Sequence, residues 1–259
     1  MKKIYTAIIA TALIASTVLG VAAQRADGYS WYIKKRGNLP PDFPKEATMV
    51  DENHGYYIDK CAANNGEKII YLTFDAGYDN GNVEKTLDIL RENNVPGAFF
   101  ILSNIIIKNT DTVKRMFEEG HLVCNHTKNH KYLGELTDSE IEANLSALKK
   151  LCYDRTGYQM VDYFRFPEGR FDERTIKKVS DLGYSTFFWS MCYADWDNGK
   201  QMSPESAIAK LKNSTHNGAV ILLHPTSETN VKILPTLIQE WKDQGYTFGS
   251  LTDLVEKNS

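Results

Sequence analysis

Apolar and polar positions alternate in two rhythms from about residue 69 onward. Short apolar, β-branched runs predict buried strands, and apolar residues at helical spacing predict amphipathic helices. Predicted strands cover residues 69–74, 98–102, 122–124, 161–165, 185–189, 219–223 and 246–248. Predicted helices follow near residues 83–90, 111–119, 137–153, 173–182, 204–213 and 234–242. Repeated strand–helix units favour an α/β fold with a parallel sheet and helices outside it.

The N-terminal residues carry a different pattern. Lys2 and Lys3 precede an apolar run, and the small residues Val21, Ala22 and Ala23 follow it. This order is typical of a secretory signal peptide, although the run is nearly long enough to span a membrane. We therefore predict export, with residues 1–23 acting as a signal peptide or as an N-terminal membrane anchor.

Residues 24–67 separate this leader from the regular alternation. They are rich in polar residues and contain Pro40, Pro41 and Pro44. Such composition favours turns and irregular structure. We predict an irregular lead-in here, followed by a single α/β domain over residues 68–259.

Composition narrows the function classes. The chain has 259 residues, is 42% hydrophobic and carries a formal net charge of -3, with its basic residues scattered. This balance gives no electrostatic drive toward nucleic acid. The four cysteines, Cys61, Cys124, Cys152 and Cys192, include no CxxC pair, so a zinc–thiolate site is not expected, and free thiols are favoured over disulfides.

Ionisable side chains follow several predicted strands. Because chemistry in parallel barrels occurs at the C-terminal ends of the strands, these residues should converge on one rim. Separately, each has an ordinary structural interpretation, such as a helix cap, a surface ion pair or a buried histidine. Their recurrence at corresponding strand ends favours an active site instead. The residues are Asp75, His126, His130, Arg165, Asp195 and His224.

Five segments carry a family resemblance. The segments TFDAGYDNG, NHTKNH, FRFPEGRF, YADW and ILLH occur in the order of the five motifs of the polysaccharide deacetylase family, also called the NodB-homology domain or carbohydrate esterase family four. The likeness covers about residues 68–257. It implies a distorted, TIM-like (β/α) barrel of about seven units.

One branch of the family resembles this chain most in detail. It comprises the deacetylases that act on N-acetylmuramic acid in peptide-free glycan strands and lead to muramic δ-lactam in the spore cortex. Tyr78 with the following Asn80 and Gly81, and the FDERT segment after Arg170, carry that likeness. The resemblance implies peptidoglycan glycan strands as the partner, and a monomer facing the cell wall in the space around the forespore.

Family roles transfer to matching residues of this chain. The resemblance implies that Asp75 is the general base and that Arg165 holds it ionised. It also implies that His224 is the general acid, kept protonated by Asp195. His126 and His130 would bind a divalent metal ion, zinc or another cation. Substrate-binding roles fall on Trp196, Gly169, Arg170 and Tyr78, with backbone amides near residues 167–169 completing an oxyanion site.

Two positions depart from the family pattern. Ala76 stands where most members have the aspartate that is the third metal ligand, so we predict a weakly bound metal, with Asp75, Asp79 or water filling the vacancy. Glu168 stands where the muramic-acid branch usually has an arginine that meets the lactyl carboxylate. Arg170 is the substitute that we consider.

Two other functions fit parts of the same pattern. One is a deacetylase of N-acetylglucosamine polymers, such as chitin or vegetative peptidoglycan, or of acetylated xylan. The other is a non-catalytic glycan-binding protein that lost turnover through Ala76. Intact Asp75 and His224 argue against the second, because a binding protein needs no matched acid and base.

Overall fold

A computed structural model of the chain describes residues 28–258, so the predicted signal peptide or anchor lies outside the described part. Its main sheet has nine strands, all paired in parallel, in the order β11-β12-β5-β6-β7-β8-β10-β4, with β13 also beside β5. The strands are β4 (Gly55–Tyr56), β5 (Ile69–Ala76), β6 (Ala98–Ile101), β7 (Leu122–Asn125), β8 (Tyr163–Phe164), β10 (Ser185–Phe187), β11 (Met191–Cys192), β12 (Ala219–Leu223) and β13 (Thr247–Phe248).

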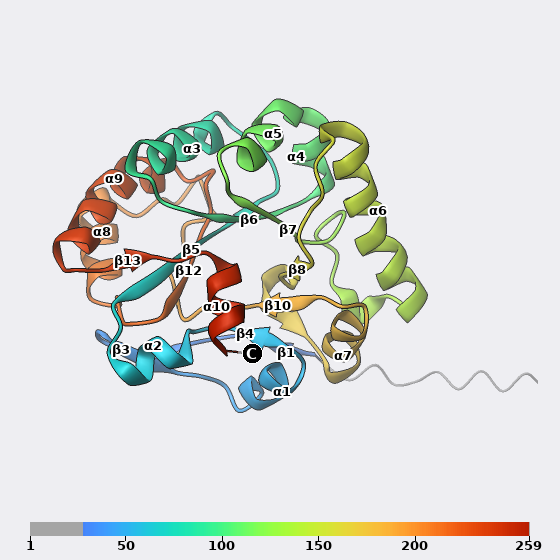
Figure 1. Cartoon of the computed structure of the whole chain (residues 1–259), viewed down its shortest axis with the longest axis horizontal. Helices are drawn as coiled ribbons and strands as arrows, with labels where there is room; N and C mark the ends of the chain where they lie inside the picture. The colour runs from blue at the N-terminus through green and yellow to red at the C-terminus, as the bar shows by residue number, and fades with distance from the viewer. Residues whose placement is uncertain (1–27, 259) are drawn as a thin grey trace, which may run out of the picture.

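Helices surround this curled sheet (Figure 1). The α-helices are α1 (Ala47–Glu52), α2 (Lys60–Asn65), α3 (Asn82–Asn93), α4 (Ser103–Lys108), α5 (Thr110–Glu118), α6 (Asp138–Thr156), α7 (Glu173–Asp181), α8 (Pro204–Lys212), α9 (Glu228–Asp243) and α10 (Leu251–Asn258). Near the end of the strand path, an isolated bridge joins Ile58, just after β4, to Ala219 of β12. The sheet is thus a distorted (β/α) barrel in one domain, as predicted.

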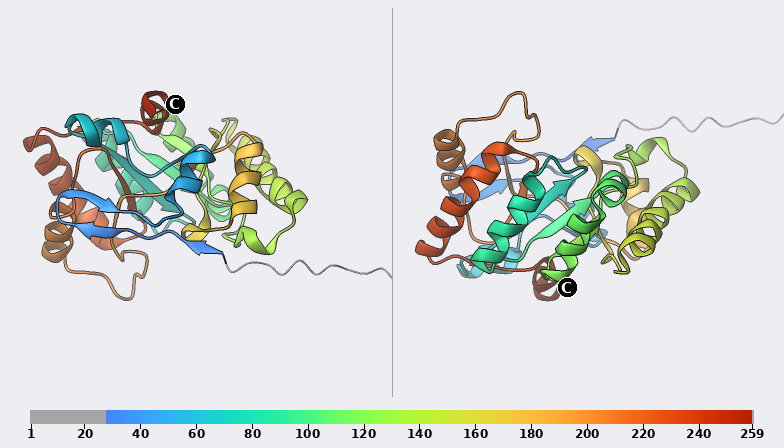
Figure 2. Two further views of the ribbon diagram at one scale, coloured as in Figure 1. Left: turned by 90° about the horizontal axis from the view of Figure 1, so that it is seen from below. Right: turned by 90° about the horizontal axis from the view of Figure 1, so that it is seen from above.

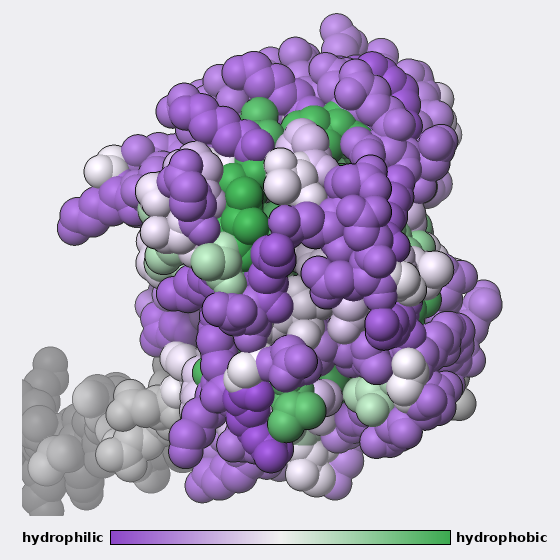
Figure 3. Space-filling model, turned by 90° about the vertical axis from the view of Figure 1, so that its left-hand side faces the viewer, coloured by the Kyte–Doolittle hydropathy of each residue, from purple (hydrophilic) through white to green (hydrophobic). Residues whose placement is uncertain are grey.

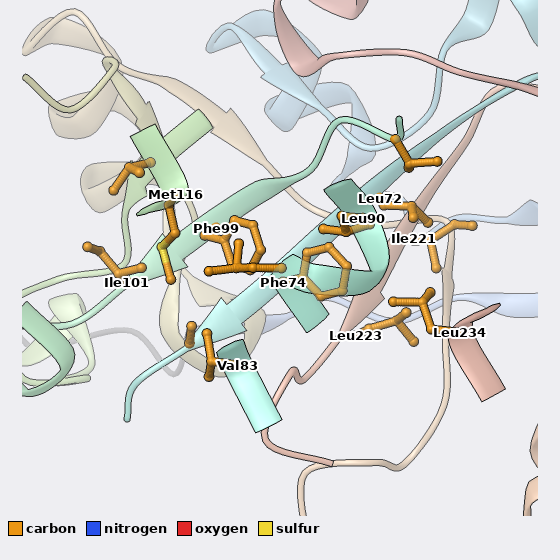
Figure 4. Close-up of a cluster of buried hydrophobic side chains, with 14 of the residues drawn as sticks. Leu72, Phe74, Val83, Leu90, Phe99, Ile101, Met116, Ile221, Leu223 and Leu234 are labelled. Atoms are coloured by element: carbon orange, nitrogen blue, oxygen red, sulfur yellow. The ribbon is translucent and has the colours of Figure 1, made fainter. Parts of the chain in front are cut away.

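Apolar side chains between the sheet and the helices form the largest part of the core (Figure 4). Leu72 and Phe74 of β5 pack with Phe99 of β6, and α3 and α9 contribute Leu90 and Leu234. Phe74 and Phe99 stack with ring centroids 4.9 Å apart. Burying the apolar runs of β5, β6 and β12 on this face fixes the strand registers, and with them the positions of the residues at the strand ends.

Most predicted elements match the structure within a few residues. The helix predicted from residue 137 begins with a capping box, in which Thr137 accepts from the Glu140 backbone N–H. The last long helix was predicted wrongly at its start, because α9 begins at Glu228, behind the N-cap residue Ser227, and continues through Pro235. Pro235 is the eighth residue of α9, and because it has no N–H, it cannot make the backbone hydrogen bond to the Val231 carbonyl that another residue would make there.

The prediction of an irregular lead-in was wrong for the described residues from 28 onward. They form β1 (Tyr29–Ser30), β2 (Lys34–Arg36), β3 (Leu39–Asp42), α1, β4 and α2, and β4 pairs with β10 in the main sheet. Prolines mark turns but are tolerated at sheet edges, which explains Pro40 and Pro41 in the short hairpin strand β3. The β1 strand pairs antiparallel with β9 (Arg170–Phe171), far along the chain (Figure 2).

The outer surface is polar where helices α8 and α9 lie. The corresponding space-filling view is mostly hydrophilic, with small separate hydrophobic spots (Figure 3). Across the described residues, we find no helix with the length and apolarity that crossing a membrane requires. All four cysteines are unpaired, as favoured from their spacing.

Candidate active site

A pocket of about 590 Å³ opens at the C-terminal ends of the strands. Three strands of the sheet lead directly to it, because Asp75 lies near the end of β5, His126 follows β7 and His224 follows β12. The remaining lining residues are Gly77, Tyr78, Leu102, His130, Glu168, Gly169, Trp189, Cys192, Tyr193, Trp196, Leu222 and Thr226. The predicted convergence on one rim is therefore present.

Asp75 and Arg165 form the central ion pair. Arg165 Nη1 donates to Asp75 Oδ1 over 2.8 Å, and the Arg165 side chain is fully buried. Burial alone would raise the pKa of Asp75, but the charge and hydrogen bond of Arg165, together with the charges of His126 and His224, outweigh burial and hold that pKa below its usual value. Asp75 is thus an ionised carboxylate at the pocket wall.

Three further acceptors fix the Arg165 guanidinium. Nε donates to the Phe187 carbonyl over 3.0 Å, and Nη2 donates to Thr73 Oγ1 over 2.9 Å and to the Phe188 carbonyl over 3.3 Å. The guanidinium carbon also lies 4.1 Å from the centroid of the Phe100 ring. A buried arginine with four hydrogen bonds holds one orientation, so it holds Asp75 in one orientation as well.

His224 and Asp195 form a second pair at the same pocket, where His224 follows β12, the neighbour of β5. His224 Nδ1 donates to Asp195 Oδ1 over 2.7 Å, while the His224 backbone N–H and Asn230 Nδ2 donate to Oδ2 over 2.8 and 2.6 Å. Desolvation lowers the pKa of His224, but the hydrogen bond and charge of Asp195 more than offset it, so this pKa is raised overall. Nε2 of His224 remains available to the pocket.

The two predicted metal-binding histidines meet through a loop. The segment after β7 is not helical: Thr127 and His130 have φ of 71° and 59°, and this tight loop brings the rings of His126 and His130 to a centroid distance of 5.0 Å. The two rings therefore come together through a loop and not on one face of a helix.

His126 is prepared to act as a neutral ligand. Its Nδ1–H donates to the Arg165 carbonyl over 2.9 Å, which leaves Nε2 as the lone-pair atom, 3.4 Å from Asp75 Oδ2. Burial lowers the pKa of His126 to about 4. A backbone carbonyl behind a metal-binding imidazole is a common orienting arrangement. The histidine pair therefore fits a divalent cation.

The side chain at position 76 cannot act as the third metal ligand. Ala76 is fully buried and presents only a methyl group. Asp79 accepts from the backbone N–H groups of Gly81 and Val83, so it caps the start of α3 and does not line the pocket. Among residues 28–258, no group of three or more His, Cys, Asp or Glu side chains is arranged to hold a metal ion.

Two of the predicted substrate-binding residues are exposed aromatics at the pocket mouth. Trp196 is 63% exposed, with its ring 6.4 Å from that of His224. Tyr78 is 44% exposed, and its hydroxyl accepts from Asn198 Nδ2 over 3.1 Å. Both rings are placed to pack against a sugar that enters the pocket.

The segment after Arg165 holds two further candidates and a correction. Gly169 lines the pocket with φ of 64°, but its N–H donates to the Phe166 carbonyl over 3.0 Å, and Pro167 has no N–H. Of the three predicted oxyanion donors, Glu168 is therefore the one left with a candidate N–H. Arg170 is not brought into the pocket: its guanidinium lies 4.2 Å from the Tyr132 ring centroid.

Some supporting residues gave no signal in the sequence. Asn230, on α9, donates to Asp195, and its Oδ1 accepts from the Tyr193 hydroxyl over 2.5 Å. Thr73 lies two residues before Asp75 on β5, and its hydroxyl accepts from Arg165 Nη2. Thr73 could have been suspected, because a polar residue interrupts an otherwise apolar buried strand.

The rim of this parallel barrel holds a carboxylate that is paired with an arginine and a histidine that is paired with a second carboxylate. This arrangement is typical of a hydrolytic enzyme. The comparisons specify this class. The family model described as polysaccharide deacetylase matches residues 62–187. The peptidoglycan-N-acetylmuramic acid deacetylase PdaA of Bacillus subtilis (strain 168) is 35% identical over 257 residues, covering 98% of this chain and 96% of the relative.

Solved structures agree with the sequence relatives. The structure of Bacillus subtilis PdaA, a family 4 carbohydrate esterase, matches with a TM-score of 0.84 and 35% identity, covering 90% of this chain and 99% of the other. A family 4 carbohydrate esterase from Bacillus anthracis matches at 0.73 and 31%, over 89% and 97%. The chain therefore belongs to the polysaccharide deacetylase family, carbohydrate esterase family 4, and is a hydrolase of polysaccharide amides.

Proposed function

We propose that the protein removes the N-acetyl group from N-acetylmuramic acid in peptide-free peptidoglycan strands, the step that leads to muramic δ-lactam in spore cortex. The observation that carries the proposal is the opposed pair of Asp75 with Arg165 and His224 with Asp195 at one pocket. The near-full-length likeness to a relative named for N-acetylmuramic acid deacetylation supports the choice of sugar.

Asp75 is the group that accepts a proton from the attacking water. Its pKa lies below the usual range because Arg165 stabilises the charged form, so it is ionised and ready to accept at neutral pH. The cost of a low pKa is a weaker base. Fixed orientation within the pocket compensates, since a positioned base acts at high effective concentration.

His224 is the group that protonates the departing amine. Nδ1–H is held by Asp195, so a protonated imidazole presents its second N–H, on Nε2, to the pocket. The raised pKa keeps a larger fraction of His224 protonated at neutral pH. The Glu168 N–H is the proposed donor to the oxyanion of the tetrahedral intermediate, in a segment that lines the pocket.

His126 and His130 are the residues that would hold a divalent metal ion. Members of this family generally use such an ion, which supplies Lewis-acid polarisation of water and of the acetyl carbonyl. Two imidazoles without a third protein ligand predict weak retention of the ion. The family and its cell-wall substrates also support export, with action outside the cytoplasmic membrane around the forespore.

The product amine would lie beside the lactyl carboxylate of the same muramic acid. Such an intramolecular pair cyclises readily once both groups are held close, with loss of water to give the δ-lactam.

The position of Glu168 favours a second candidate function, an N-acetylglucosamine deacetylase. Its carboxylate is exposed at the pocket and would repel a lactyl carboxylate.

A substrate panel tests the proposal. Peptide-stripped peptidoglycan, intact peptidoglycan and chitin oligomers are incubated with the enzyme and an added divalent cation, and mass spectrometry locates each lost acetyl group. We expect loss from muramic acid residues in the stripped strands. Loss from N-acetylglucosamine alone would overturn the muramic assignment. In Glu168→Arg we expect higher activity on stripped strands and unchanged activity on chitin oligomers.

A further inference from the structure

A buried tryptophan from the lead-in connects the two walls of the pocket. The backbone N–H of Trp31 donates to the Gly169 carbonyl over 2.8 Å, and Nε1–H donates to the Trp189 carbonyl over 2.9 Å. Gly169 and Trp189 both line the pocket, while no residue of the lead-in that the structure describes does so. Trp31 therefore contacts both pocket-lining residues without lining the pocket itself.

The strand pairing explains how Trp31 reaches this position. Tyr29 and Ser30 of β1 pair antiparallel with Phe171 and Arg170 of β9, so the next residue, Trp31, continues the register to Gly169. A Cβ on Gly169 would lie 3.0 Å from the Trp31 Cβ and 2.8 Å from an atom of the Trp189 ring. Glycine at 169 is thus needed both for its φ of 64° and for close packing of the three residues.

The same side chain reaches the Asp75–Arg165 pair through one intermediate residue. The Trp31 ring stacks on Phe188 with a centroid distance of 4.6 Å and an interplanar angle of 26°. The Phe188 carbonyl in turn accepts from Arg165 Nη2. Phe43 and Tyr57 enclose the other sides of the indole, at 5.8 and 4.9 Å. Trp31 is only 4% exposed, so its position is fixed by packing.

We propose that Trp31 is a positioning residue for the hydrolysis: it holds the Glu168–Gly169 segment and the Phe188–Trp189 segment in register across the pocket. It acts through these segments and touches no reacting atom. The matched family region begins only at residue 62, so this contribution comes from outside it. The inference rests on the proposed use of the pocket for deacetylation, but not on which sugar is deacetylated.

Steady-state kinetics of two variants test the proposal, on whichever N-acetylated glycan the wild type hydrolyses. In Trp31→Ala we expect kcat to fall by about 10–100-fold, because displacing a wall by about 1 Å commonly costs that much. KM should change less. Trp31→Phe keeps the backbone N–H and an aromatic ring, so it should recover most of kcat. The alkaline limb of the pH profile should stay unchanged, since neither His224 nor Asp195 contacts Trp31.

Leu145→Ala is the matched control, since Leu145 is buried in the same hydrophobic cluster on α6 and does not line the pocket. All variants are assayed well below their melting temperatures, measured by circular dichroism. The proposal is overturned if folded Trp31→Ala keeps the wild-type kcat, or if Leu145→Ala loses as much. Should Trp31→Ala not fold, Trp31→Leu takes its place, because leucine removes the ring and the indole N–H but keeps an apolar side chain. A folded Trp31→Leu with the wild-type kcat would overturn the proposal. A wild type that prefers N-acetylglucosamine would refute only the muramic proposal.

Discussion

The two sides of the pocket differ in how completely they are built. On the acid side, the Asp195 carboxylate accepts three hydrogen bonds, two from His224 and one from Asn230. On the base side, Arg165 holds Asp75 firmly, but the adjoining histidine pair lacks a third partner and His130 is exposed. The contrast indicates that the chain fixes both proposed proton-transfer groups by its own hydrogen bonds, whereas it supplies an incomplete set of metal ligands.

Removing either proton-transfer group should have the largest effect. We expect Asp75→Asn and His224→Ala each to lower kcat by about 10²–10⁴-fold, the usual contribution of general acid–base catalysis. Acetate release from stripped glycan strands measures the loss. Asp79→Asn is the matched control, because Asp79 also follows β5 but caps α3 outside the pocket. More than about a tenth of wild-type activity in either variant would contradict the assigned roles.

Supplying the missing ligand should have a smaller effect, mostly on the ion. Ala76→Asp should retain a divalent cation roughly 10–100-fold more tightly, the range that metal-supporting contacts often contribute. Dialysis followed by elemental analysis measures retention, and Ala76→Asn is the control of equal size without charge. Stoichiometric metal in the dialysed wild type would show that another group, such as Asp75, already completes the site.

The sequence predicted the parallel strand–helix units and the rim because both depend on local pattern, whereas the barrel was implied by the family resemblance. Apolar runs place β5, β7 and β12, and a residue directly after a buried strand has little freedom of position. The partners of the site residues could not be predicted in the same way. Asn230 and Trp31 lie 35 and 158 residues from their partners Asp195 and Trp189, and such contacts follow only from the closed barrel.

Errors arose where composition and conformation disagree. The prolines of the lead-in suggested irregular structure, yet Pro40 and Pro41 lie within the hairpin strand β3. His126 and His130 lie four residues apart, and the positive φ of Thr127 and His130 brings them together through a loop that the spacing alone does not specify. For Arg170, alternation along β9 turns the side chain to Tyr132, and sequence distance from Arg165 gave no indication of this.

The pH profile of kcat/KM for the wild type and for Asp195→Asn tests the central claim most directly. Asp195 raises the pKa of His224, and activity requires the protonated form, so the rate should fall as pH rises through that pKa. A neutral asparagine removes the charge while burial remains, so the alkaline limb should move to lower pH and the maximum should fall. The same alkaline limb in both proteins would contradict the assignment of His224 as the acid held protonated by Asp195.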